Sequence, residues 1–176
     1  MRIAISGTHS VGKTTLVNEL KKHLDLNVIS EVARDYPRDI TDDPEGEMNR
    51  QLNIFHSQLE QEMENYMGFI SDRSTIDNAA YMIRALKIYG HKLSIRDYLL
   101  VVNNINVALN TMYSYDYLFY IPIEFPSIYD GFRSTDEVER YEIDVIISEL
   151  LGDDKIIING TLEERVKKVL EIINEN

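Results

Sequence analysis

An eight-residue stretch near the start of the sequence has the residue types and the spacing of a loop that binds phosphate. Gly7-Thr8-His9-Ser10-Val11-Gly12-Lys13-Thr14 matches the pattern G-x-x-x-x-G-K-[ST]. The two glycines let the backbone turn so that successive N–H groups point at a polyphosphate. The lysine can reach the β- and γ-phosphates, and the hydroxyl of Thr14 can ligate Mg²⁺. We therefore predict that this loop binds a nucleotide.

A pair of charged residues, Asp72 and Arg73, ends the apolar run Gly68–Asp72. At the end of such a strand, Asp72 can hold Mg²⁺ directly or through water. An ATPase motor usually carries Asp-Glu at this place, where the glutamate activates water. The arginine found here suits an anionic or hydroxyl-rich acceptor, so the pair favours phosphoryl transfer over hydrolysis. The alternative is that both residues only cap a helix and form a structural ion pair.

Glu31 and Arg34 follow the apolar run Asn27–Ser30 in the same way. Ligands of open α/β sheets bind at the carboxyl ends of parallel strands, and a carboxylate there can accept the proton of an attacking hydroxyl. Arg34 lies on the same side as Glu31 if a helical turn begins after the strand. A solvated ion pair in a loop is the alternative.

A third group lies beyond the fourth apolar run. Asp130-Gly131-Phe132-Arg133 precedes a helix whose start is signalled by Ser134 with Glu137 three residues later. Arg140 falls about two turns along this helix, on nearly the same face as Arg133. The segment 123–142 can thus form a lid whose arginines neutralise charge that develops on the γ-phosphate. The alternative is an ordinary acidic helix with paired arginines.

Short β-branched segments alternate with longer amphipathic ones, which is typical of an α/β domain with a parallel sheet. The expected strands are Arg2–Ser6, Asn27–Ser30, Gly68–Asp72, Tyr117–Pro122 and Lys155–Asn159. The expected helices are Lys13–Leu24, Glu47–Tyr66, Thr75–Tyr89, Ser94–Met112, Thr135–Leu151 and Leu162–Asn174. Thr161 with Glu164 reads as a capping box at the start of the last helix. The polar segments Tyr36–Glu47 and Ile123–Thr135 are expected to be loops.

The composition limits the class of protein. The 176 residues include 18 Lys+Arg and 30 Asp+Glu, which gives a net charge of −12, and there is no Cys. Duplex nucleic acid is bound largely through Lys and Arg on phosphates, so the acidity disfavours that partner. Aliphatic runs are too short for a membrane span or a signal peptide, and the [NT]-K-x-D motif of guanine-specific GTPases does not occur. We expect a single acidic domain, residues 1–176, in the cytoplasm.

Together these residues resemble the P-loop nucleoside and nucleotide kinases. The resemblance is carried by the phosphate loop, Glu31-x-x-Arg34, Asp72-Arg73-Ser74, Asp130-Gly131-Phe132-Arg133 and Ile157-x-x-Gly160-Thr161-Leu162-Glu163-Glu164-Arg165. The nearest branches are NadR-type ribosylnicotinamide kinase-like domains and thymidylate or deoxynucleoside kinases. The resemblance implies a three-layer P-loop NTPase fold, in which helices flank a five-stranded parallel sheet of order 2-3-1-4-5 and a small helical lid covers the phosphates.

The resemblance also implies roles for individual residues. The catalytic residues would be Lys13, Glu31, Asp72 and Arg133. Those that bind ATP would be Gly7, Thr8, His9, Ser10, Val11, Gly12, Lys13, Thr14, Thr15, Arg140, Asn159, Gly160 and Thr161. The acceptor would be bound by Glu31, Arg34 and Arg73, and Mg²⁺ by Thr14 and Asp72.

The expected function is transfer of the γ-phosphate of ATP, with Mg²⁺, to a small nucleoside or nucleoside monophosphate. Two alternatives stay open. One is a nucleotide-dependent regulatory NTPase or switch without a small acceptor, and the other is a kinase that acts on a modified base in phage DNA. A membrane partner is not expected, nucleic acid is disfavoured without being excluded, and a homodimer is left open.

Overall fold

The computed structural model describes residues 1–37, 43–126 and 136–175. Its centre is one sheet of five parallel strands in the order β2-β3-β1-β4-β5, as the resemblance implied. The strands are β1 (Arg2–Ser6), β2 (Asn27–Ile29), β3 (Phe69–Asp72), β4 (Tyr117–Tyr120) and β5 (Ile156–Ile157). The register pairs Ile5 of β1 with Asp72 of β3 on one side and with Phe119 of β4 on the other. The carboxyl ends of the central strands therefore lie level with one another.

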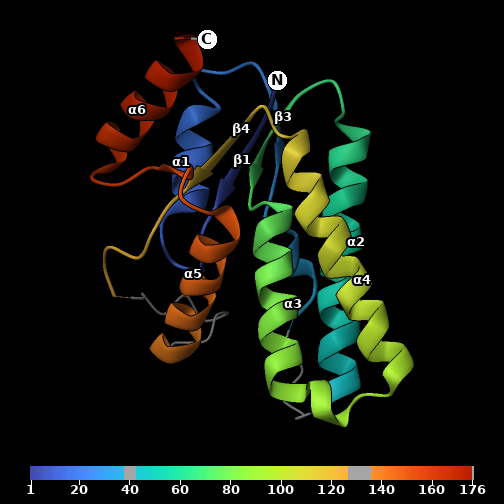
Figure 1. Cartoon of the computed structure of the whole chain (residues 1–176). Helices are drawn as coiled ribbons and strands as arrows, with labels where there is room; N and C mark the ends of the chain where they lie inside the picture. The colour runs from blue at the N-terminus through green and yellow to red at the C-terminus, as the bar shows by residue number, and fades with distance from the viewer. Residues whose placement is uncertain (38–42, 127–135, 176) are drawn as a thin grey trace.

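Two apolar layers hold helices against the faces of the sheet. On one face, α1 (Lys13–Leu20) and α6 (Leu162–Asn174) pack over β1 and β4, with Leu16, Val166 and Phe119 in the shared core. On the other face, α3 (Thr75–Tyr89) and α5 (Glu137–Leu151) contact β4 through Ile76, Ile143 and Tyr120. Figure 1 shows the strands between the pair α1 and α6 and the group α2, α3 and α4. Alternate strand residues point to opposite faces, so β4 contributes Phe119 to one core and Tyr120 to the other.

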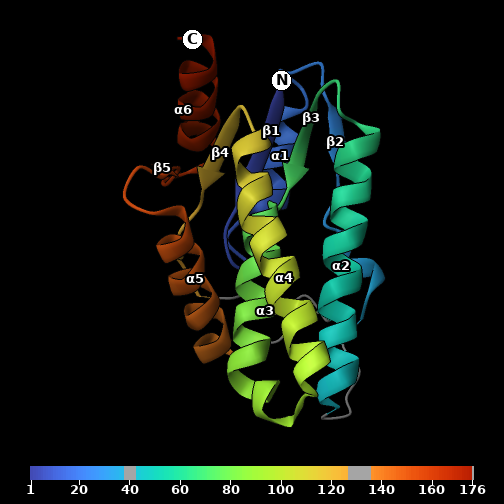
Figure 2. The ribbon, with the colours of Figure 1, turned by 45° about the vertical axis from the view of Figure 1, so that its right-hand side comes forward.

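The helices α2 (Pro44–Glu64), α3 and α4 (Ile95–Thr111) form a bundle with a core of its own, in which Phe55 and Met82 are fully buried. Figure 2 shows these three helices side by side, extending past the carboxyl ends of the strands. The three helices thus continue beyond the edge at which the strands end. Within the described ranges, no helix has the length and apolar character needed to cross a membrane.

The observed elements differ from the predicted ones mainly at their ends. The helix α2 begins at Pro44, inside a segment predicted to be a loop, because Asp43 caps it by accepting a hydrogen bond from Glu45 N at 3.2 Å and a proline suits its first turn. The helix α5 begins at Glu137 with Asp136 as its N-cap, two residues later than predicted. The strand β5 is shorter than predicted because it lies at the sheet edge and pairs with β4 alone. Short helical turns occupy Val32–Asp35, Gly90–Lys92 and Met112–Ser114.

Candidate active site

The phosphate loop joins β1 to α1, as predicted. Its backbone takes left-handed values at Gly7 (φ 149°), Ser10 (φ 57°) and Gly12 (φ 93°). A Cβ at Gly7 would lie 2.5 Å from the carbonyl oxygen of Ile121, so no side chain fits there. The Lys13 Nζ donates to the carbonyl oxygen of Thr8 at 2.7 Å. The side chain of Lys13 is thus hydrogen-bonded to the backbone of its own loop.

Lys13 is only 3% exposed, and this burial has an electrostatic effect. Burial, together with the nearby positive charge of Arg73, lowers the pKa of Lys13 to about 8, although the carboxylates of Asp72, Asp77 and Glu31 favour the ammonium form. A buried cation attracts an anion more strongly than a cation in water does, because the local dielectric constant is lower. The lysine is therefore well placed to meet a polyphosphate.

Asp72 ends β3 beside the first turn of α1. The Thr14 hydroxyl donates to Asp72 Oδ2 at 2.5 Å, which brings the two predicted Mg²⁺ ligands together. The other carboxylate oxygen, Oδ1, is buried and has no hydrogen-bond partner. Among the described residues, no group of three or more histidine and carboxylate side chains could hold a metal alone. Mg²⁺ usually takes one or two protein ligands and fills its octahedron with phosphate oxygens and water, so an unpaired carboxylate oxygen next to a hydroxyl fits that ion.

Glu31, Arg34 and Arg73 meet where β2 and β3 end. Arg73 donates from Nε at 2.9 Å and from Nη2 at 2.6 Å to Glu31 Oε1, and Arg34 Nε donates to Oε2 at 3.2 Å. Glu31 and Arg73 are buried, whereas half of the Arg34 side chain is exposed. A helical turn, Val32–Asp35, brings Arg34 to the same side as Glu31. The ion pair between Glu31 and Arg34 that the alternative named is present, but its carboxylate is buried and not solvated.

Arg73 is held in a rare backbone conformation, with φ 113°. Its N–H donates to the carbonyl oxygen of Ile5 at 3.1 Å, and its guanidinium lies over the ring of Tyr81, 5.2 Å from the ring centre. A non-glycine residue in this region costs of order 1–3 kcal/mol and persists only when its surroundings hold it. Such strain is typical of functional sites, so the position of this arginine is unlike that of an ordinary surface cation.

The predicted lid is only partly described. Arg133 and the segment Asp130-Gly131-Phe132 lie outside the described residues. Arg140 is fully buried and donates from Nε to His9 O and from Nη2 to Ser10 O, both at 3.1 Å, while Nη1 pairs with Glu137 at 3.1 Å. The guanidinium of Arg140 thus contacts the phosphate loop itself, and the predicted role of this residue in a lid that binds ATP stays a prediction. Its guanidinium binds loop carbonyls because the first turns of α5 pack directly behind the phosphate loop.

Two residues of the site had no predicted role. Asp77 is fully buried and accepts hydrogen bonds from Ser6 Oγ at 2.8 Å and from Gly7 N at 2.9 Å, which ties the start of the loop to α3. Arg165 donates from Nη1 to Val11 O at 2.8 Å. Asp77 also forms the capping box of α3 with Ser74, a pattern that the sequence contains. Nothing in the sequence indicates the long-range contact of Arg165, which is 154 residues away from Val11.

Asn159, Gly160 and Thr161 lie in an exposed loop between β5 and α6. Gly160 N donates to both carboxylate oxygens of Glu124, at 3.0 and 3.1 Å. The predicted capping box is present, since Thr161 and Glu164 each cap the other's backbone N–H. The loop therefore has a defined shape at the same edge of the sheet, while its contact with adenine stays a prediction.

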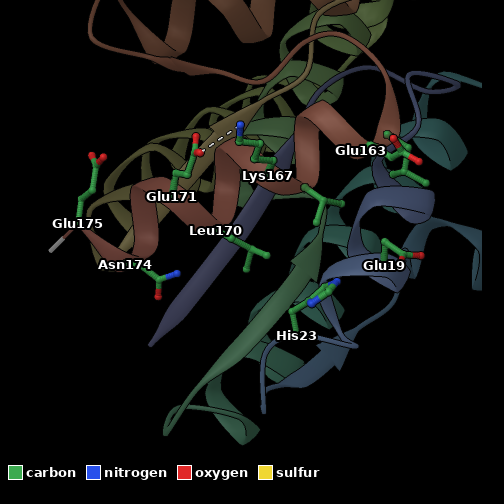
Figure 3. A pocket seen from close by; sticks show the side chains of 10 residues that line it. Glu19, His23, Glu163, Lys167, Leu170, Glu171, Asn174 and Glu175 are labelled. Carbon is green, nitrogen blue, oxygen red and sulfur yellow. Dashed lines mark ion pairs between the residues drawn. The ribbon is translucent and has the colours of Figure 1, made fainter.

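A separate groove of about 830 Å³ lies between α6 and the end of α1. Figure 3 shows Leu170 of α6 on the side toward His23, and Lys167 paired with Glu171 on the same helix. The groove contains none of the residues predicted for the site. Four glutamates line it against a single lysine, which disfavours a phosphate-bearing ligand. We therefore place the candidate active site at the strand ends.

The sheet order, the loop between β1 and α1, and the polar groups at the ends of β2 and β3 define the fold of the P-loop nucleoside and nucleotide kinases. Deoxyadenosine kinase from M. mycoides, solved with bound dCTP, is 18% identical with a TM-score of 0.75, over 100% of both chains. NadR, solved in complex with NR, is 22% identical with a TM-score of 0.73 over 99% of this chain and 50% of NadR, so this chain spans half of that protein. Thymidylate kinase from Candida albicans is 16% identical, with a TM-score of 0.67 over 99% of this chain and 91% of that chain.

The sequence itself matches a described family. Residues 2–165 match the family described as "AAA domain", and the chain belongs to this family. No curated protein sequence matches the chain.

Proposed function

We propose that this protein is an ATP- and Mg²⁺-dependent phosphotransferase that acts on a small nucleoside or nucleoside monophosphate. One observation carries the proposal: a buried carboxylate bound by two arginines, Glu31 with Arg34 and Arg73, lies at the strand ends beside a phosphate loop. A nucleotide switch needs no such group in this place. Structures that share the fold are described with bound dCTP and with NR, which supports small nucleotides as ligands.

The residues of the chain divide into a donor side and an acceptor side. When bound, Mg²⁺ and ATP would supply the transferable phosphoryl group, with Thr14 and Asp72 holding the metal. Lys13 and the loop N–H groups neutralise charge on the transferred group and hold it in line with the acceptor, which is the main source of rate in this chemistry. On the acceptor side, Glu31 accepts the proton of an attacking hydroxyl, or Arg34 and Arg73 bind an acceptor phosphate.

Several further parts of the proposal rest on the sequence. We infer that the whole chain, residues 1–176, acts as one kinase domain with a lid at about 123–142. We place the protein in the cytoplasm, because ATP is available there. The chain has no Cys and forms no disulfides, so it needs no oxidising environment. Asn159, Gly160 and Thr161 would lie near adenine. The two alternatives are a regulatory NTPase and a kinase for a modified base in phage DNA, and the following experiment distinguishes them from the proposed function.

The test is transfer of label from γ-labelled ATP, with Mg²⁺, to a panel of acceptors. The panel contains nucleosides, nucleoside monophosphates, ribosylnicotinamide and short DNA duplexes. We expect label on one small acceptor. Label on DNA alone would favour the modified-base kinase, and slow hydrolysis that no acceptor stimulates would contradict the kinase proposal.

We predict that nucleotide binding weakens as the pH rises above about 8. Lys13 is charged below its lowered pKa of about 8 and neutral above it in the free protein. A bound polyphosphate raises this pKa again, so binding at pH 8.5 must take up a proton. The dissociation constant should rise by up to about tenfold per pH unit above pH 8. Calorimetry in two buffers with different ionisation enthalpies measures the uptake, and equal heats in both would contradict the prediction.

We also propose that the protein forms a homodimer through the outer face of α4. The segment from Tyr98 to Tyr115 contains no charged residue in a protein whose charge is −12. Leu99 and Val107 are about half exposed on it, and Tyr113 is 82% exposed. In a two-fold interface each patch meets its own copy, so charged groups of one sign would repel each other. Apolar groups can pack against the same groups of the second copy. Amides such as Asn103 and Asn106 can hydrogen-bond to their own copies, because an amide both donates and accepts.

The oligomeric state in solution tests this interface. Light scattering after size exclusion should give the mass of two chains at micromolar concentration, and Val107→Asp should give one chain. Val138→Asp is the matched control, because Val138 is an exposed valine on α5. A monomeric wild-type protein, or an equal effect of both substitutions, would contradict the proposal.

A further inference from the structure

Two buried arginines from the far end of the chain hold three consecutive carbonyl groups of the phosphate loop. Arg140 of α5 donates to His9 O and Ser10 O, both at 3.1 Å. Arg165 of α6 donates to Val11 O at 2.8 Å. Arg140 is 0% and Arg165 5% exposed. These guanidinium groups therefore contact the outer side of the loop backbone and not solvent.

The direction of these carbonyls decides the direction of the neighbouring N–H groups. All peptide bonds of the described chain are trans, and in a planar trans peptide the C=O and the next N–H point in opposite directions. When the three carbonyls point at the arginines, the N–H groups of Ser10, Val11 and Gly12 point away from them. That is the side on which a phosphate binds in a concave run of N–H groups.

Arg165 has two more contacts that Arg140 does not share. Its Nε donates to the carbonyl oxygen of Gly160 at 2.9 Å, and its Nη2 pairs with Glu124. Glu124 in turn accepts from Gly160 N. One guanidinium thus joins the phosphate loop to the loop that follows β5. Gly12 allows this approach, because a Cβ there would lie 3.1 Å from Arg165 Nη1.

We propose that Arg140 and Arg165 are positioning residues that hold the phosphate loop in its binding conformation, and that Arg165 also sets the distance between the phosphate site and the loop at Gly160. The inference rests on the proposed binding of a nucleoside triphosphate. It adds that the affinity of the loop depends on side chains that do not themselves reach the nucleotide. Arg140 acts on the phosphates alone, whereas Arg165 acts on the phosphates and on the base side together.

The experiment compares two ligands on three variants by calorimetry. The ligands are inorganic tripolyphosphate and ATP, and the variants are Arg140→Met, Arg165→Met and the control Arg84→Met. Arg84 pairs with Glu139 and Glu142 at 3.1 Å and links α3 to α5 without contacting the loop. The control therefore reports the effect of losing a partly buried arginine on α5 packing.

Arg140→Met should weaken both ligands by the same factor, on the order of tenfold for two lost charge-assisted hydrogen bonds. Arg165→Met should weaken ATP more than tripolyphosphate, and Arg84→Met should weaken neither. Arg140→Lys keeps one charged donor group and should lose less affinity than Arg140→Met. This variant also tests the inference if Arg140→Met does not fold. If Arg140→Met and Arg165→Met fold and bind both ligands with wild-type affinity, the inference is wrong, while the proposed function is unaffected. A wild-type protein that binds neither ligand would contradict the proposed function itself.

Discussion

Replacing Lys13 with methionine is expected to lower the rate of phosphoryl transfer by about 10²–10³-fold, the loss typical of removing one preorganised group that stabilises developing charge. Methionine is similar in length to lysine and carries no charge, so its side chain still occupies the space inside the loop. The ammonium group is buried, and burial is the main reason for its lowered pKa. The substitution therefore relieves the cost of burying a charge but removes the hydrogen bond from Lys13 Nζ to the carbonyl oxygen of Thr8, so the melting temperature should change little.

The control for this experiment is Lys22→Met. Lys22 is exposed, follows α1 and pairs with Glu19 at 2.6 Å, so its loss should leave transfer unchanged. Rates are measured with the acceptor identified by the panel, at saturating acceptor. A Lys13→Met enzyme that keeps more than half of the wild-type rate would contradict the assignment of the loop to the phosphoryl donor.

Replacing Glu31 with glutamine, and separately Arg73 with methionine, is expected to show which kind of acceptor the protein uses. For a hydroxyl acceptor, Glu31→Gln removes the proton acceptor and should lower kcat by about 10²–10⁴-fold. For a monophosphate acceptor the attacking oxygen is already ionised, so Glu31→Gln should cost less. In that case Arg73→Met should raise KM for the acceptor more than it changes KM for ATP, because a phosphate loses its guanidinium partner.

Both substitutions also break a buried ion pair, which costs about 3–5 kcal/mol when one charge is left unpaired. The melting temperature of each variant must therefore be measured with its kinetics. Glu142→Gln is the control for loss of a paired carboxylate, since Glu142 of α5 contacts two cations of α3, Arg84 and Lys87, and lies outside the site. If the activity of Glu31→Gln and Arg73→Met falls only in proportion to the fraction of folded protein, the acceptor role of this pair is contradicted.

The sequence predicted the parts of the fold that local pattern determines. The phosphate loop is recognisable because two glycines, a lysine and a hydroxyl stand at a spacing that few other structures need. The strands were found because β-branched segments are short and separated by amphipathic helices. The ends of α2 and α5 were misplaced because aspartates outside the expected positions cap them. Helix ends depend on single side-chain hydrogen bonds, which pattern alone determines poorly.

The sequence indicated those residues of the candidate site that directly follow a strand. It did not indicate residues that reach the site from distant parts of the sequence. Asp72, Arg73 and Glu31 follow β3 and β2, and adjacent parallel strands bring their ends together. The contact of Arg165 with Val11 depends on how α6 packs against α1, which no local spacing encodes. Arg140 was predicted to act in a lid, and its complete burial could not be predicted from a segment rich in acidic residues.

The pairing of Glu31 with Arg73 has a consequence for the stability of the fold. Both charges are buried and the backbone at Arg73 is strained, so this corner of the sheet carries free-energy costs that oppose folding. Well-packed apolar residues in place of such a pair are often neutral or stabilising. A variant with apolar residues at both positions is therefore expected to have an equal or higher melting temperature. Such a variant would keep the fold and lose the site proposed for the acceptor.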